Sequence, residues 1–248
     1  MNANRQSTVL KGDNKERNMK LTASSLIRWA GLAAMGAGIL FIVIQPIHPP
    51  DVLASVTTAR WAIVHSVGIT MCLLGLLGMA GLYARQVKAV GWLGLAGFLL
   101  LSLFYALTLA FQFAEAFILP LWATEAPTFV AGWLTIPNGQ ASEMNLGALP
   151  ALYTLTGFVG YVLGGLLFGI APRRAGILPR WAAGLLAVAA VAPFVLAQLP
   201  HPLNRTFAVP MGVALAWLGY ALWSERRTHA ADPVSGGVSP QLRPTAAE

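Results

Sequence analysis

The chain has 248 residues, of which 56% are hydrophobic and only 10% are charged, and its formal net charge is +7. A soluble domain carries about 25% charged residues, so this composition excludes an ordinary soluble protein. The apolar residues fall into blocks of about 20, which is the length that an α-helix needs to cross a bilayer. The single cysteine, Cys72, excludes a disulfide framework, a CxxC redox pair and a cysteine-rich metal site.

In chain order, a polar segment at 1–25 is expected to be disordered, a membrane domain covers 26–223, and a Pro-, Gly- and Ser-rich tail at 224–248 is again expected to be disordered. We predict an all-α polytopic membrane protein with six transmembrane helices, at about 29–47, 61–83, 92–121, 149–171, 181–199 and 207–223. The first apolar block is longer than the core of a signal peptide, so we expect it to be retained as a helix.

The basic residues indicate how these helices are oriented. Of the 16 Lys and Arg residues, 14 lie in the segments 1–28, 84–91, 172–180 and 224–248, and only Arg60 and Arg205 lie on the other side. The positive-inside rule therefore places both termini in the cytoplasm, as an even number of spans requires. We expect a multi-pass protein of the cell membrane, and in a bacterium of the inner membrane. Topology and anionic lipid explain the basic charge, so no nucleic-acid partner is expected.

One phrase occurs twice in the chain, as "FIVIQPIHPP" and as "FVLAQLPHPL". The match extends back to an Arg-Trp pair before each block, and it aligns the Gln and His three residues apart in both copies. The third span carries a more divergent version that ends in "FQFAE". This pattern predicts three tandem helical hairpins, formed by spans 1–2, 3–4 and 5–6. The alternative is a chance similarity between apolar sequences.

The repeated polar residues form the candidate site. Counted from the inner end of each span, every pair falls at the outer edge of the membrane, and residues three apart share a helical face. We name His48, His65, Glu115 and His201 as candidate metal or proton ligands, with Gln45, Gln112 and Gln198 as supporting polar residues. Imidazole and carboxylate suit a divalent transition metal such as zinc, and the same groups suit a proton relay. In the structural alternative, each side chain only caps or seats a helix end.

The longest outer loop, 124–148, contains the apolar stretch "PTFVAGWLTIPNG". This stretch is apolar enough to form a short interfacial helix that covers the polar cluster, and a plain surface loop is the alternative. Asp51, Glu125 and Glu143 also fall in outer loops, where we expect a solvated role for each of them.

Several stretches resemble one group of proteins: "RWAGLAA", "GLYARQ", "GWLGLAGFLL", "LPRWAAGLLAVAA" and "WLGYALWSERR". They are similar to sequences of uncharacterised bacterial multi-pass inner-membrane proteins, and the resemblance covers most of 26–227. It implies a bacterial inner-membrane location and no known activity.

The chain contains no HExxH, GxSxG, P-loop, GxGxxG or CxxC motif, so no enzyme class is indicated. Two functions stay open. The first is a small transporter or a cation- or proton-binding protein with its site at the outer membrane face. The second is a non-catalytic membrane sensor or assembly partner in which the polar residues are structural. The lipid bilayer is the expected partner, no cofactor is predicted beyond the zinc-like metal, and a protein partner or homo-oligomer stays open.

Overall fold

The computed structural model describes residues 22–195 and 203–229, and every regular element in this part of the chain is helical, which confirms the all-α prediction. The elements are α1 (Ala23–Ile47), α2 (Leu53–Val56), α3 (Ala59–Phe113), the π-helical segment η1 (Ala114–Ile118), α4 (Leu119–Glu125), α5 (Pro127–Thr135), α6 (Leu149–Thr154), the π-helical segment η2 (Leu155–Leu163), α7 (Gly164–Ala175), α8 (Arg180–Val195), α9 (Leu203–Thr206) and α10 (Val209–His229).

The first and last helices reach beyond the predicted membrane domain. The side chain of Thr22 caps α1 by accepting a hydrogen bond from the backbone N–H of Ser25, so the helix already begins at Ala23. At the other end, α10 continues to His229. Glu225 in this extension accepts two hydrogen bonds from the guanidinium of Arg85, at 2.6 and 2.9 Å. Helices α1 and α10 therefore include 23–25 and 224–229 as well as the predicted spans.

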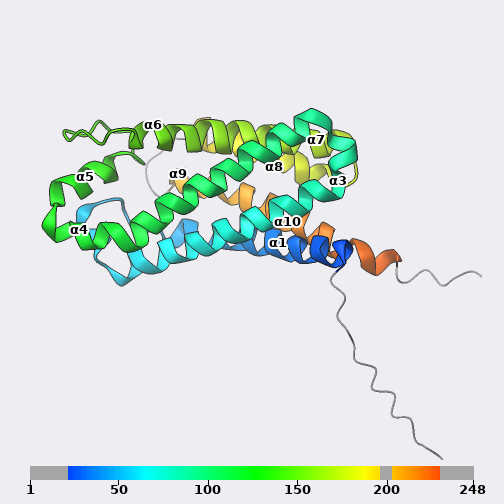
Figure 1. The fold of residues 1–248 in the computed structure, drawn as a ribbon, viewed down its shortest axis with the longest axis horizontal. Coiled ribbons are helices and arrows are strands. Elements are labelled where there is room, and N and C mark those ends of the chain that lie inside the picture. The colour runs from blue at the N-terminus through cyan, green and yellow to red at the C-terminus, as the bar shows by residue number, and fades with distance from the viewer. Residues whose placement is uncertain (1–21, 196–202, 230–248) are drawn as a thin grey trace, which may run out of the picture.

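Helix α3 is two antiparallel arms, 59–90 and 92–113, joined at a single residue. Gly91 has φ 56° and ψ −158°, a conformation that is essentially restricted to glycine. The predicted linker at 84–91 is therefore helical up to Val90. The two arms run in opposite directions in Figure 1, and near the turn they are in contact, because the rings of Tyr83 and Phe98 stack with centroids 4.6 Å apart.

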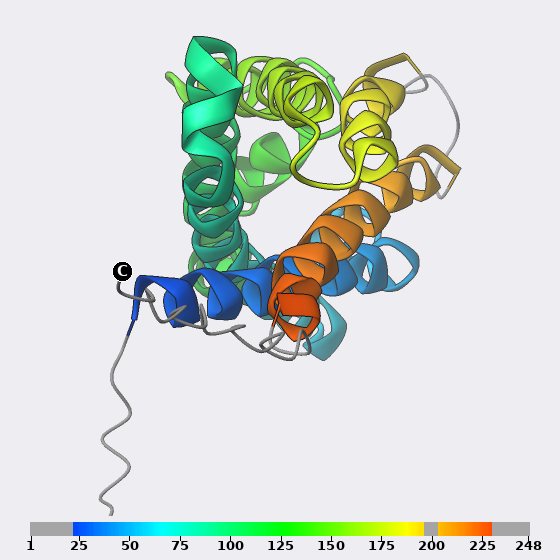
Figure 2. The same cartoon turned by 90° about the vertical axis from the view of Figure 1, so that its right-hand side faces the viewer.

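The long helices form a ring in which each packs on its neighbours. Helix α1 packs against α10 and α3, α3 against α7, α7 against α8, and α8 against α10. Figure 2 shows this arrangement from the end that holds the α3 turn. Small residues allow the closest approach: a Cβ atom on Gly31 would lie 2.9 Å from the carbonyl oxygen of Gly219. Such glycine contacts are typical of helix packing in membranes.

Three helical stretches in the described residues are long and apolar enough to cross a membrane: Ala23–Ile47, Ala59–Glu125 and Leu149–Ala175. Large apolar side chains also face outward along them. Leu77 is 61% exposed and Leu121 is 72% exposed, which would be unfavourable in water. The structure is therefore that of a helical membrane protein.

The two ends of the bundle differ in character. The start of α1, the α3 turn and the end of α10 lie together at one end, which we call the turn end (Figure 1). Helices α4, α5 and α9 lie at the opposite end, which we call the loop end (Figure 1). The predicted polar residues that the structure describes lie at the loop end.

Candidate functional site

A cavity of about 190 Å³ opens at the loop end. Its lining includes the polar side chains of His48, Asp51, His65, Gln112, Glu115 and Arg205. The first arm of α3 supplies His65, and Gln112 and Glu115 come from the second arm and from η1. The α3 hairpin thus brings together residues that are distant in sequence.

His65 and Glu115 form the centre of the cavity wall. The Nδ1 atom of His65 lies 3.0 Å from Oε2 of Glu115 and 3.1 Å from Oε1 of Gln112. Both of these oxygens are acceptors, so Nδ1 carries a proton. The side chains are only 2% and 8% exposed, respectively, so their interaction is screened little by solvent. We call these two residues the His65–Glu115 pair.

The backbone at Glu115 is held by an interaction that depends on a proline. In η1, the N–H of Leu119 bonds to the carbonyl of Ala114, so it is not available to Glu115. The next residue, Pro120, has no N–H, which leaves the Glu115 carbonyl without a partner from its own helix. The indole Nε1 of Trp61 donates to this carbonyl at 2.7 Å. The buried Trp61 therefore satisfies a carbonyl that the helix cannot.

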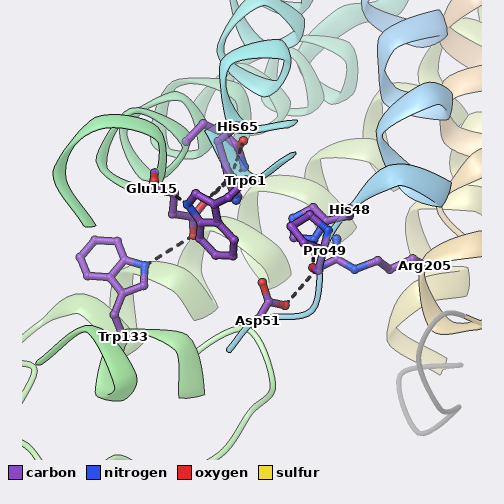
Figure 3. A network of polar contacts seen from close by, with 9 residues as sticks. His48, Pro49, Asp51, Trp61, His65, Glu115, Trp133 and Arg205 are labelled. Atoms are coloured by element: carbon purple, nitrogen blue, oxygen red, sulfur yellow. Dashed lines mark hydrogen bonds and ion pairs between the residues drawn. The ribbon is translucent and has the colours of Figure 1, made fainter. Parts of the chain in front are cut away.

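Helix α5 closes one side of the site. Its Trp133 donates from Nε1 to Oε1 of Glu115 at 3.5 Å, and Figure 3 shows Trp133 and Trp61 approaching Glu115 from different sides. Trp133 is buried, as are its neighbours Val130 and Leu134. The apolar stretch at 127–139 thus begins with a short helix that packs on the polar cluster, and it is not a plain surface loop.

His48 lies directly after α1 and faces His65 across the site. Its Nδ1 lies 2.7 Å from the carbonyl oxygen of Pro49, so this nitrogen carries a proton as well. The two imidazole rings are nearly perpendicular, with centroids 5.2 Å apart. Two titratable rings therefore lie side by side at the loop end.

Asp51 and Arg205 are site residues that the sequence reasoning missed. Asp51 was expected to be solvated, but its side chain is only 11% exposed, and Arg205 NH2 donates to its Oδ2 at 3.1 Å (Figure 3). Burial raises the pKa of Asp51, and the nearby Arg205 opposes that shift. A signal was present in the sequence, because Arg205 is one of only two basic residues assigned to the outer side.

The predicted residues differ in where the structure places them. His48, His65, Gln112 and Glu115 line one cavity. Gln45 is not among the lining residues, and its Nε2 donates to the carbonyl of Phe41 in its own helix at 2.9 Å. Gln198 and His201 lie outside the described residues. Within 22–195 and 203–229, no three His, Cys, Asp or Glu side chains are grouped so that they could hold a metal ion.

Both π-helical segments contribute to this cavity. Segment η1 carries Glu115, and η2 carries Thr156 and Gly157, which line the cavity. A π-helical turn shifts the side chains around the helix axis and is frequent at functional sites. Both π-helical segments therefore lie at the cavity, where they carry polar side chains of its lining.

We compared the chain with protein-family models, with curated proteins and with solved structures, and none of them matches it. We therefore infer its function from the geometry of the cavity.

Proposed function

We propose that this chain is a six-span protein of the cell membrane, with both termini in the cytoplasm, whose loop-end cavity binds a proton or a small cation from outside. The observation that carries the proposal is the His65–Glu115 pair, a buried carboxylate and imidazole in contact within a polar cavity. Imidazole titrates near neutral pH, and a buried carboxylate favours the binding of a cation or a proton.

The charges at the two ends support this orientation. Arg28 lies over the ring of Trp223 and Arg173 over that of Trp181, and these contacts belong to the turn end, where the α3 turn also brings Arg85. An excess of arginine at one end of a bundle is typical of the cytoplasmic side, and tryptophan is typical of a membrane interface on either side. The cavity at the opposite end would then face the outside.

The proton-binding part of the proposal depends on the groups that surround the pair. His48 follows α1, Asp51 precedes α2, Arg205 belongs to α9, and Tyr153 belongs to α6. Arg205 is paired with Asp51, so its charge is largely compensated. The His65–Glu115 pair is then the part of the cavity whose carboxylate has no arginine or lysine partner among the described residues.

Cysteine accessibility tests the topology. In a Cys72→Ala background, single cysteines at Gln140→Cys and Lys88→Cys would both be exposed, one in the longest outer loop and the other near the α3 turn. A membrane-impermeant maleimide applied to intact cells should label position 140 and leave position 88 unlabelled until the membrane is opened. Labelling of position 88 in intact cells would exclude the proposed orientation.

Infrared difference spectroscopy tests the proton site. The protein in nanodiscs should show a carboxyl C=O band that changes with pH, and Glu115→Gln should remove that band. Glu125→Gln is the matched control, because Glu125 is exposed at the end of α4 and outside the cavity. Identical spectra for wild type and Glu115→Gln would refute proton binding at this pair.

A further inference from the structure

The charge balance of the cavity leaves one carboxylate without a fixed cationic partner. Asp51 is paired with Arg205 at 3.1 Å. Glu115 instead receives hydrogen bonds from the neutral donors Gln112 Nε2 and Trp133 Nε1, at 3.4 and 3.5 Å, and contacts the imidazole of His65. No Lys or Arg in the described part of the chain pairs with it. A buried carboxylate in this position favours a cationic ligand.

The second observation concerns Nε2 of His65, which is buried without a hydrogen-bond partner among the described residues. The Nδ1 proton of His65 faces Glu115 and Gln112, so in the neutral ring Nε2 is an acceptor. A buried polar atom of this kind normally has a partner. An N–H group in the cavity that His65 lines would supply one.

The walls of the cavity are partly aromatic. Phe104, Phe111 and Tyr153 line it together with the polar residues. Aromatic faces attract organic cations through the ring quadrupole, and the attraction increases when the cation is desolvated. A carboxylate combined with aromatic walls therefore favours a cation that also has apolar groups.

The cavity is better suited to a small organic ligand than to a single metal ion. A zinc ion requires ligand atoms at about 2.0–2.2 Å, and no metal-binding group of three acidic, His or Cys side chains is present in the described ranges. The cavity measures about 190 Å³. An engineered cavity of about 150 Å³ holds a benzene-sized molecule, so this one accommodates a small organic ligand.

We propose that this cavity binds a small alkylammonium ion, with the ammonium group at Glu115 and His65 and the alkyl group against Phe104 and Phe111. The inference rests on the proposed function, because it names the cation that occupies the same site. Glu115 supplies the negative charge, His65 Nε2 accepts one N–H, and the aromatic rings enclose the apolar part. The ligand would compete with a proton held at the His65–Glu115 pair.

Isothermal titration calorimetry on the full-length protein in nanodiscs tests this, with three probes of similar size and different charge: propylammonium, 1-propanol and propionate. We expect propylammonium to bind and the other two to bind at least tenfold more weakly. Equal binding of 1-propanol or propionate would overturn the assignment of a cation.

Variants then locate the binding site. Glu115→Gln keeps the size of the side chain and should weaken propylammonium binding at least tenfold, and Phe111→Leu should weaken it severalfold. Glu125→Gln should bind as wild type does. Thermal unfolding of each variant checks that the fold is retained, and the three-probe comparison on the wild type does not depend on any variant. Unchanged affinity in Glu115→Gln would overturn the site.

The two proposals fail in different ways. If propylammonium does not bind while the carboxyl band of Glu115 still changes with pH, only the alkylammonium inference is wrong. If the band is also absent, the proton site is wrong as well. Binding of Zn²⁺ in place of propylammonium, lost in Glu115→Gln, would overturn the inference in favour of a metal ion.

Discussion

His65 lies on the first arm of α3 and Glu115 lies in η1, directly after the second arm; both are equally far along the chain from Val90, and their side chains meet at 3.0 Å. The turn at Gly91 sets this register. A shift of one residue in the turn would rotate the two side chains by about 100° relative to each other, because an α-helix has about 3.6 residues per turn. The backbone at Gly91 therefore determines whether the pair forms.

The first prediction concerns the coupling within this pair. We expect His65→Leu and Glu115→Leu each to destabilise the protein by about 1–3 kcal/mol, because each leaves a buried polar partner unsatisfied. The double variant His65→Leu/Glu115→Leu should lose less unfolding free energy than the two single variants lose together. The difference, which is the coupling energy of the pair, should be about 0.5–3 kcal/mol. Thermal or denaturant unfolding in detergent measures all three. Strict additivity would show that the two side chains do not interact.

The second prediction compares the two tryptophans that contact Glu115. Trp61→Phe should cost about 1–3 kcal/mol, because the Glu115 carbonyl has no acceptable donor in its own helix once the 2.7 Å bond is lost. Trp133→Phe removes a weaker bond of 3.5 Å and should cost less than about 1 kcal/mol. Both changes keep an aromatic ring, so the difference in unfolding free energy reports the hydrogen bonds. The reverse order would refute the role given to Trp61.

The third prediction tests the contact between α1 and α10. A Cβ atom on Gly38 would collide with the carbonyl oxygen of Gly212 and lie 2.6 Å from the backbone N of Ala216. Gly38→Ala should therefore destabilise the bundle by about 1–3 kcal/mol. Gly36→Ala is the control on the same helix, because there the Cβ atom meets only the end of the Leu74 side chain at 3.2 Å. Equal unfolding temperatures for the two variants would contradict this close packing of α1 on α10.

The fourth prediction concerns the pH dependence of the Asp51–Arg205 pair. Burial raises the pKa of Asp51 and Arg205 opposes this, so Arg205→Gln should raise that pKa further. A carboxyl group with a raised pKa in the folded state makes the protein less stable as pH rises from the unfolded value towards the folded one. Arg205→Gln should thus lower the free energy of unfolding by about 1.5–3 kcal/mol at pH 7 and by less near pH 4.

Unfolding temperatures of the wild type and of Arg205→Gln, measured between pH 4 and pH 7, check this prediction. Asp51→Asn is the control, because it removes the carboxyl group at position 51. In the double variant Asp51→Asn/Arg205→Gln, the part of this pH dependence that comes from Asp51 should disappear, because position 51 then carries no carboxyl group. A cost of Arg205→Gln that is the same at both pH values would show that Asp51 is not the group responsible.

Much of the architecture follows from the sequence because it depends on local properties. The length and apolarity of α1 and of the α3 arms, and the polar break after Ile47, reflect helix geometry and proline positions that act within a few residues. The same local spacing brings Gln112, at the end of the second arm, and Glu115, in η1, to one side of the chain, where their side chains are in contact. These features needed no knowledge of the partner helices.

The tertiary structure decided which of these polar residues meet. Gln45 has the same local spacing to His48 as Gln112 has to Glu115, but its amide donates to its own helix, whereas Gln112 contacts His65. Asp51 and Arg205 are 154 residues apart and pair only because α1 and α9 end at the same side of the bundle. Such contacts depend on tertiary structure: the turn at Gly91 brings Gln112 to His65, and the packing of separate helices brings Arg205 to Asp51. A sequence pattern does not encode them, because they arise from packing between segments that are distant along the chain.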